Sequence, residues 1–371
     1  MASFASFGNQ LYTGEKSIEF VRRQKTWYAI SGVLIVLSLA GLFGRHLNLG
    51  LEFKGGSEFR ISNAQTTNDV VGINAVHSVD PSAQAEVTKV GSDSIRVQTS
   101  KFSDSKSEGQ DTITQRVSTA LAKAYGVSDS DVSSTFIGPS WGADISKKAL
   151  KGLIAFLILV SLVIAFYFRT WTMALAGIIA LLHDLLITAG IYALVGFEVS
   201  PASVIGFLTI LGYSLYDTVV VFDKVRENTQ NLTATGRSTF SEAANLAVNQ
   251  TLVRSINTSV VALLPIASIL VIGTILVGAG TLEDLSLALL VGIATGTYSS
   301  IFIATPLLAD LREREPEMKA LKSRVLKRRA AQASQAAQVE RSADGGTGGD
   351  DAATGEGTAA RAASAKAVTV T

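Results

Sequence analysis

Six long apolar runs interrupt an otherwise polar pattern along the chain. They begin near Trp27, Gly152, Met173, Pro201, Ser255 and Leu285, and they end near Phe43, Phe168, Val195, Phe222, Val277 and Leu308. At about 1.5 Å per residue, a helix over each run can cross a hydrocarbon core of about 30 Å. Because six such runs cannot share one soluble core, the pattern predicts an α-helical integral membrane protein with six transmembrane helices. The first covers residues 27–43 and the others lie within residues 151–311.

The distribution of basic residues predicts the orientation of these spans. Lys and Arg precede the first run, follow the second and fourth, and crowd behind the sixth, whereas the short loops 196–200 and 278–284 contain none. Cytoplasmic loops carry an excess of Lys and Arg. We therefore expect segment 1–26, the loop of about residues 224–253 and the C-terminal end to be cytoplasmic. An amphipathic stretch at residues 241–250 is expected to lie along the cytoplasmic surface.

Residues 44–150 are polar and predict one folded α+β domain on the opposite, outward side. The expected order of elements is β-α-β-β-α-β, which is the order of a ferredoxin-like unit. Alternation and helical spacing place the elements at residues 57–62, 68–79, 85–90, 94–99, 112–125 and 132–137. The domain contains no paired carboxylates, Ser-His-Asp spacing or Gly-rich phosphate loop, so we expect a binding or coupling role there rather than catalysis.

Residues 312–371 form a tail that changes character along its length. Its first part, residues 312–329, is rich in Arg and Lys, which is typical of a cytoplasmic anchor. From about Ala330 the chain is mostly Ala, Gly, Ser, Thr, Gln and scattered charges, and it cannot bury a core. The composition predicts a disordered cytoplasmic segment there.

Composition and charge narrow the classes of function. Only 17% of residues are charged, against about 25% in soluble domains, and the six apolar runs account for the difference. A net charge of +1 creates no strong positive field around the protein, so we expect no nucleic-acid partner. The absence of cysteine from the sequence excludes disulfides, thiolate metal sites and cysteine nucleophiles. We expect no metal or cofactor and no catalytic residues.

A few ionisable residues lie inside the apolar runs, and these are the candidates for function. A charge within a span costs about 2.5 to 3.5 kcal/mol on insertion scales, so such residues are rare and functional by default. Asp217 lies in the fourth run among small and hydroxyl-bearing residues, and Arg254 lies at the start of the fifth. His183 and Asp184 occur together in the third run, where packing or hydrogen bonding to neighbouring helices is the favoured interpretation.

Two interpretations of Asp217 remain open from these residues alone. Burial favours the neutral form of a carboxyl group, whereas a nearby cation such as Arg254 favours the charged form. Moving the cation or a chain of water in and out would switch Asp217 between binding and releasing a proton. Alternatively, Asp217 and Arg254 form a static pair that only neutralises a buried charge.

Four sequence segments resemble the SecF branch of the SecD/SecF family, membrane subunits of the bacterial protein-export machinery. The longest is residues 212–228, GYSLYDTVVVFDKVREN, in the fourth span. The others are residues 50–56 (GLEFKGG), 249–259 (NQTLVRSINTS) and 292–307 (GIATGTYSSIFIATPL). With Leu182-His183-Asp184 and the six-span layout, the resemblance covers about residues 16–312. One departure is Tyr216, where many members carry Asn beside the Asp.

The resemblance implies a function that composition alone does not show. Members pair with a SecD-like subunit in an assembly of the resistance-nodulation-division type and work beside the SecYEG channel. They use the proton motive force to promote preprotein translocation across the bacterial inner membrane, with the proton as the coupling ion. An insertase-type membrane protein is a further candidate partner in the lipid bilayer. The family's relay residues fall on Asp217 and Arg254, and Tyr213, His183, Asp184 and Asn257 are candidates for a supporting polar role.

Two other functions stay open at this stage. A drug or lipid exporter of the same superfamily would share the membrane layout and the intramembrane carboxylate. A non-coupling assembly or insertion factor would use Asp217 and Arg254 only to hold helices together.

Overall fold

The computed structural model describes residues 4–90, 93–102, 109–273 and 280–344. The chain divides into two compact units, residues 1–322 and residues 323–371. The first unit combines long helices with a four-stranded sheet, which is called the outward sheet after the side of the membrane expected for it from the sequence. The second unit contains the C-terminal part of α13 (Pro316–Asp344).

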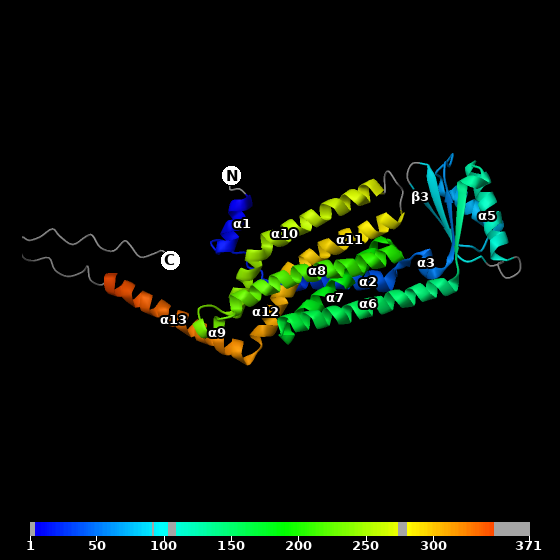
Figure 1. Ribbon diagram of the computed structural model, residues 1–371. Coiled ribbons are helices and arrows are strands. Elements are labelled where there is room, and N and C mark those ends of the chain that lie inside the picture. The colour runs from blue at the N-terminus through cyan, green and yellow to red at the C-terminus, as the bar shows by residue number, and fades with distance from the viewer. Residues whose placement is uncertain (1–3, 91–92, 103–108, 274–279, 345–371) are drawn as a thin grey trace, which may run out of the picture. The chain divides into compact units, whose positions relative to one another are not determined.

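Six helical segments of the first unit are long and apolar enough to cross a membrane (Figure 1). They are α2 (Gln24–Gly44), α6 (Pro139–Phe168), α7 (Trp171–Val195), α8 (Pro201–Thr229), α10 (Phe240–Ile272) and α11 (Gly280–Ser299). The last continues without a break through the π-helical turn η4 (Ser300–Ala304) into α12 (Thr305–Glu313). Over the described residues, each of the first five predicted spans lies on one of these helices, and the sixth runs from α11 through η4 into α12. The predicted end of the fifth span near Val277 lies outside them.

Small residues let several of these helices pack backbone against backbone. On α2 and α7, a side chain at Gly190 would collide with Ser38, and one at Gly41 would come within 2.7 Å of Leu194. Between α8 and α11, a side chain at Gly292 of α11 would likewise collide with Ile210 of α8. Helices in lipid associate through such close contacts, because no hydrophobic force drives apolar helices together there.

The structure gives detail at the ends of the spans, and one prediction there is wrong. The amphipathic stretch 241–250 is the first part of α10, and its position along the cytoplasmic surface stays a prediction. The connection at residues 224–253 contains helix: α8 runs to Thr229, α9 covers Leu232–Thr235 and α10 begins at Phe240. Residues 330–344 form the end of α13 rather than a disordered tail, since Ala, Gln, Arg and Glu favour helix. Residues 345–371 lie outside the described part.

The N-terminal segment also contains an element that the sequence did not predict. Helix α1 (Phe4–Thr13) buries Leu11 in a cluster with Val248 and Leu252 of α10 and Val221 of α8. The amides of Ile18 and Val21 then donate to the side chains of Asn249 and Asn245 on α10, at 2.8 and 3.1 Å. The segment 1–26 is therefore packed onto the helices over its described residues.

The outward part contains a four-stranded antiparallel sheet, in the order β3-β4-β2-β5. Its strands are β2 (Gly56–Ile61), β3 (Ala85–Val90), β4 (Ser94–Thr99) and β5 (Val132–Ile137), with helices α4 (Asp69–Val79) and α5 (Gln110–Tyr125) and the short turn η2 (Asp129–Asp131) between them. Alternate side chains such as Ile95 and Val97 are buried with Val117 and Leu121 of α5. Along the chain the elements therefore follow the predicted β-α-β-β-α-β order.

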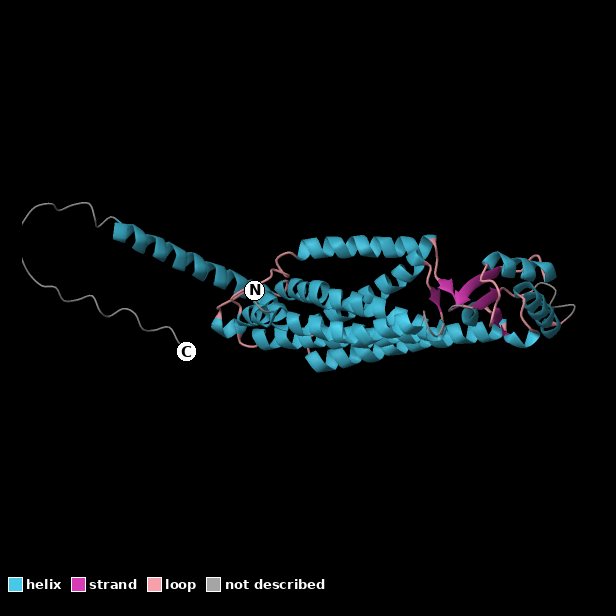
Figure 2. Ribbon diagram, turned by 90° about the horizontal axis from the view of Figure 1, so that it is seen from above, coloured by secondary structure: helices cyan, strands magenta, loops and turns pink. Residues whose placement is uncertain are grey.

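The sheet lies at one end of the long helices (Figure 2), where short elements connect it to three of them. After α2, strand β1 (Asn48–Leu49) pairs in parallel with β6 (Glu198–Val199), which directly precedes α8. Helix α3 (Leu51–Lys54) follows β1, and its Phe53 carbonyl packs against Gly142 near the start of α6. The outward sheet is thus joined to the outer ends of α2, α6 and α8.

Candidate functional site

Asp217 lies at the junction of three helical segments inside the bundle. Its side chain is only 5% exposed. Ser255 of α10 donates a hydrogen bond of 2.7 Å to Oδ1, and Ser300 of η4 donates to Oδ2. Ser214, Asp217, Thr218 and Val221 share the buried face of α8, as the spacing of i, i+3, i+4 and i+7 requires. A carboxyl group is therefore held where α8, α10 and η4 meet.

The turn that supplies Ser300 departs from regular helix geometry. Residues Ser300–Ala304 form a π-helical turn between α11 and α12, and Ser300 is fully buried. Such turns are uncommon and occur often at functional sites, because the extra residue redirects the side chains of one turn. Here the irregular turn includes the hydroxyl group that donates to Asp217.

A second buried carboxyl group, Asp184 of α7, lies beside the first. It is 1% exposed and accepts a hydrogen bond from Ser214, which precedes Asp217 by one turn of α8. Its Oδ1 lies 3.2 Å from Nδ1 of His183, whose Nε2 lies 3.1 Å from the Ser31 hydroxyl of α2. A polar chain therefore runs from α2 through α7 to α8, and it reaches the turn that carries Asp217.

The other predicted relay residue, Arg254, lies at the surface of α10. It is exposed, and its Nη2 donates to the Tyr216 hydroxyl at 3.2 Å. The hydrogen bonds of Asp217 come from serines, and the structure does not bring Arg254 into an ion pair with it among the described residues. Arg254 also lines a cavity of about 460 Å³ with Asp223, Lys224 and Tyr12 of α1.

The two remaining predicted polar residues are placed differently from each other. Tyr213 donates to Ser259 at 3.4 Å, and Ser259 is hydrogen-bonded to Thr297 of α11. Tyr213 therefore joins α8 to α10 and α11 near the site. Asn257 is exposed on α10 and takes no part in the hydrogen bonds of Asp217.

Sequence reasoning noted hydroxyl-bearing residues around Asp217 on its own helix but missed Ser255 and Ser300, which hold its carboxyl group from neighbouring segments. Ser214, Ser255 and Ser300 all lie within the segments whose sequences indicated the family. Each is at most 1% exposed. A serine within an apolar span is a weak signal by itself, because it can hydrogen-bond its own helix. Three of them in motif segments beside a carboxylate are a stronger signal.

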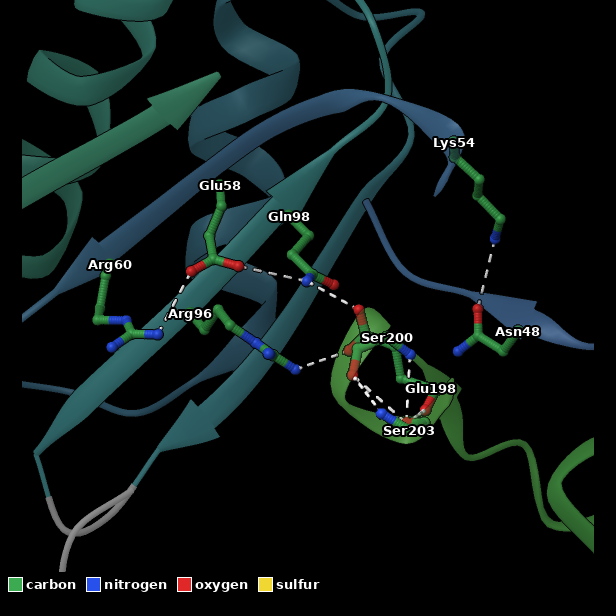
Figure 3. Close-up of polar contacts among 9 residues, drawn as sticks. All are labelled: Asn48, Lys54, Glu58, Arg60, Arg96, Gln98, Glu198, Ser200 and Ser203. Carbon is green, nitrogen blue, oxygen red and sulfur yellow. Dashed lines mark hydrogen bonds and ion pairs between the residues drawn. The ribbon is translucent and has the colours of Figure 1, made fainter. Parts of the chain in front are cut away.

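A separate polar cluster lies where the outward sheet meets the bundle (Figure 3). Glu198 of β6 forms an ion pair with Arg96 of β4 at 3.0 Å and accepts a hydrogen bond from Gln98 at 3.2 Å. Glu52, Glu58, Arg60 and Asp284 line the same cavity of about 220 Å³ as this pair. The cavity is thus lined by four carboxyl groups and two guanidinium groups.

Glu52 gives this cluster an expected pH dependence. Burial raises the pKa of the Glu52 carboxyl above its ordinary value, and the nearby charges of Glu198 and Glu58 raise it further. Below its ordinary pKa the Glu52 carboxyl is neutral in both the folded and the unfolded protein, so it has no effect on the free energy of unfolding. As pH rises through the raised pKa, the protein loses stability, because the ionised carboxylate is disfavoured in the folded state. We expect Glu52→Gln to stabilise the protein relative to wild type at about pH 8 but not at about pH 4.

Thermal unfolding of the purified protein at both pH values measures this difference. Asp129→Asn is the control, because Asp129 is exposed in η2 and does not line the cavity of the cluster. The prediction would be contradicted if the difference in unfolding midpoint between wild type and Glu52→Gln were the same at the two pH values.

The turn into the outward sheet is built on two glycines. Gly55 has a φ of 76°, which L side chains rarely adopt. At Gly56 a side chain would collide with the Thr99 carbonyl of β4. This pair of glycines lets the chain turn from α3 directly into β2.

Comparison with known proteins identifies the class. The family model for the C-terminal part of the protein export membrane proteins SecD/SecF matches residues 116–314, and the SecD/SecF GG motif matches residues 40–62. The first match covers the region from α5 to α12, which includes Asp184, Asp217 and Arg254, and the second includes Gly55 and Gly56. The chain belongs to the SecD/SecF family of protein-export membrane proteins.

Full-length relatives place it with the SecF subunits of that family. It is 47% identical to the protein translocase subunit SecF of Streptomyces coelicolor over 93% of this chain and 90% of that protein. It is 41% identical to SecF of Mycobacterium tuberculosis, over 92% of this chain and 77% of that protein.

A solved structure has the same arrangement. The crystal structure of SecDF, a translocon-associated membrane protein from Thermus thermophilus, matches 81% of this chain with a TM-score of 0.67 and 29% identity. The present chain spans 39% of that SecDF chain. With six apolar helices and these relatives, the chain is a multi-pass membrane protein.

Proposed function

We propose that this chain pairs with a SecD-like subunit and uses the proton motive force to promote preprotein translocation. The observation that carries the proposal is Asp217, a buried carboxyl group held at a three-helix junction by two hydroxyl donors. No enzymatic step, metal or cofactor enters the proposal, and the proton is the coupling ion.

Protonation of Asp217 changes the hydrogen bonds that join the three segments. An ionised carboxylate accepts from Ser255 and Ser300 together. A protonated carboxyl group carries an O–H donor on one oxygen, and that oxygen accepts more weakly than a carboxylate oxygen. One serine hydroxyl is therefore favoured to turn and accept, or to move away. Gain and loss of one proton therefore favour two different arrangements of α8 against α10 and η4.

The available energy is sufficient for such a change. One proton that moves down a potential of 100 mV supplies about 2.3 kcal/mol. Rearrangement of one or two buried hydrogen bonds costs about 1–3 kcal/mol, which is of the same size. In the proposed cycle Arg254 exchanges its contact with Tyr216 for one with Asp217 after the proton leaves. The buried network of Asp184, His183 and Ser31 supports the neighbouring turn.

The partner proposal rests on the SecDF relatives. The SecDF of Thermus thermophilus is 38% identical to this chain over 192 residues, which are 25% of its length. A protein in which both parts share one chain supports a SecD partner for the separate subunit. We further propose that the pair works beside a SecYEG channel on a preprotein, with an insertase-type membrane protein as a further partner.

The proposed location is the bacterial cytoplasmic membrane, with both termini in the cytoplasm. The basic residues around the inner ends of the spans support this orientation. We also assign the outward domain to the ferredoxin-like class, and the strand order β3-β4-β2-β5 with two crossing helices supports that assignment.

An assembly or insertion factor is the second candidate, and one observation favours it. Asp217 already binds residues of both α10 and η4, which a static link between helices would also require. Half of a drug or lipid exporter is the third candidate, and its distinguishing feature would be function without a SecD-like partner.

Export into inverted membrane vesicles tests the proposed function. Vesicles from cells that lack the subunit are given either this chain with its SecD-like partner or this chain alone. We expect a preprotein to be exported faster when the pair is present and a proton gradient is applied. An uncoupler should remove the increase, because it removes the proton gradient. An increase of the same size without the partner, or one that persists with the uncoupler, would contradict the proposal.

A further inference from the structure

The side chain of Glu198, three residues before α8, forms an ion pair and a hydrogen bond with strand β4 of the outward sheet. We propose that Glu198 is a positioning residue that makes the outward sheet follow the movement of α8. The consequence for export rests on the function proposed above, whereas the tie between Glu198 and β4 is independent of it.

The outward sheet presents a polar face to the bundle. Ile95 and Val97 of β4 point into the domain core, so the alternate residues Arg96 and Gln98 project from the opposite face. Figure 3 shows both side chains directed toward Glu198. The face that the domain's own helices leave uncovered is therefore the face in contact with the end of α8.

The contact is a partly buried, charge-assisted pair. The side chains of Arg96 and Glu198 are 18% and 17% exposed, and the pair is closed at 3.0 Å. Gln98 donates to the second oxygen of the same carboxylate. Because solvent screens such a pair less than an exposed one, it holds its partners more firmly than a surface ion pair.

Glu198 is fixed to α8 on its other side. Its carbonyl accepts a hydrogen bond from Ser203 in the first turn of α8, and Ser203 also forms a capping box with Ser200. The next residue, Val199, accepts from the Gly50 amide at 2.9 Å in the β1–β6 pair. The backbone of Glu198 therefore cannot shift independently of the start of α8.

Helix α8 connects this contact to the buried site. Pro201 begins the helix and Asp217 lies sixteen residues further along it. At about 1.5 Å per residue this separation is about 24 Å. The helix contains no internal proline or break over that length, so a tilt at Asp217 is carried to its outer end.

The charges around Glu198 predict how charge reversal at either partner of the ion pair affects the contact. Glu52, Glu58 and Asp284 line the same cavity as Glu198, and among the described residues the cations that line it are Arg60 and Arg96. Arg60 pairs with Glu58 at 3.4 Å, which leaves Arg96 as the cation that faces Glu198. Arg96→Glu alone should therefore place two carboxylates against each other and repel the end of α8. Arg96→Glu combined with Glu198→Arg should restore the attraction between the two side chains.

Distance measurement in the intact complex tests the tie without reference to export. Spin labels are placed at Lys123→Cys on α5 and Val195→Cys at the outer end of α7, in a chain that has no native cysteine. Both positions are exposed. We expect a narrow distance distribution for the otherwise unchanged protein, a broad one for Glu198→Ala, and a narrow one again for the double variant Arg96→Glu with Glu198→Arg. Asp129→Ala, in the exposed turn η2 away from this contact, should leave the distribution narrow.

Export in the vesicle assay then tests the consequence. Glu198→Ala should lose most of the gradient-dependent stimulation, and the charge-reversed double variant should regain it. If Glu198→Ala does not fold, a bis-maleimide that links Arg96→Cys to Glu198→Cys replaces it, and the stimulation should survive this link because the tie stays closed. A narrow distribution in Glu198→Ala, no recovery in the double variant, or loss of stimulation on linking overturns the proposal.

The two proposals fail in different ways. If Asp217→Asn keeps full stimulation while Glu198→Ala broadens the distance distribution, the proton-coupling role is wrong and the tie stands. If Asp217→Asn abolishes stimulation while the Glu198 variants change neither distance nor export, coupling stands and the tie is wrong.

Discussion

Asp217→Asn should leave the chain folded and paired with its partner, yet remove all stimulation of export by a proton gradient. An amide has nearly the size of a carboxyl group and can still accept from Ser255 or Ser300 through its oxygen. It cannot gain or lose a proton in the physiological range. The vesicle assay, with and without a gradient, measures the loss directly.

Asp223→Asn is the matched control for this variant. Asp223 lies six residues further along α8, is exposed, and lines the cavity that contains Arg254. It should retain the stimulation. If Asp217→Asn instead unfolds, or separates from its partner, Asp217 acts as a static link between helices. Full stimulation in Asp217→Asn would remove it from the relay.

Gly190→Leu should clearly lower the stability of the helix bundle. Leucine favours helix over glycine, so local propensity alone would stabilise the variant. At Gly190, however, the new side chain would occupy the position of Ser38, where α2 and α7 are in contact. Overpacking of this kind costs about 1–3 kcal/mol. A lower midpoint of thermal unfolding in detergent is the expected result.

Gly32→Leu is the control for the effect of propensity. Gly32 lies on α2, the helix that Gly190 of α7 contacts, and nothing lies within 4 Å of a side chain built there. Its midpoint should stay equal to wild type or rise. Equal midpoints for the two leucine variants would show that the close contact between α2 and α7 does not limit stability. Separation of these helices should also break the contact between Ser31 and His183.

The sequence predicted the spans well because lipid imposes a simple requirement. A crossing helix must be apolar over about 20 residues, and that requirement can be read locally. The outward strands were also readable, since Ile95 and Val97 alternate with Arg96 and Gln98. The two-residue strands β1 and β6 could not be predicted, because they depend on a pairing between distant segments and leave almost no local pattern.

The sequence was sufficient to predict Asp217 as the central residue of the candidate site. It was not sufficient to predict which side chains surround Asp217. The cost of a charge in lipid singles out Asp217 from the sequence. The identity of its hydrogen-bond partners depends on which helix faces which, and on the π-helical turn that presents Ser300. Arg254 was predicted beside Asp217 because of its position in the span, whereas its guanidinium group lies against Tyr216.

The error at residues 330–344 has a different origin. Few apolar residues in a segment mean that it cannot bury a core, and disorder was predicted for that reason. Many of the same residues, Ala, Gln, Arg and Glu, are strong helix formers, so a helix can extend there without a core. Composition alone does not distinguish these two outcomes.

The parallel pairing of β1 with β6 sets an order of events during synthesis. Asn48 and Glu198 are 150 residues apart in the sequence, and the whole outward domain lies between them. At about 5–20 residues per second, the ribosome needs about 8–30 seconds to make that stretch. The outward domain therefore has time to fold before the residues that anchor it exist. Its attachment to α8 is therefore a late step in biogenesis. Slower translation of the residues that follow the domain would delay this attachment without delaying the folding of the domain itself.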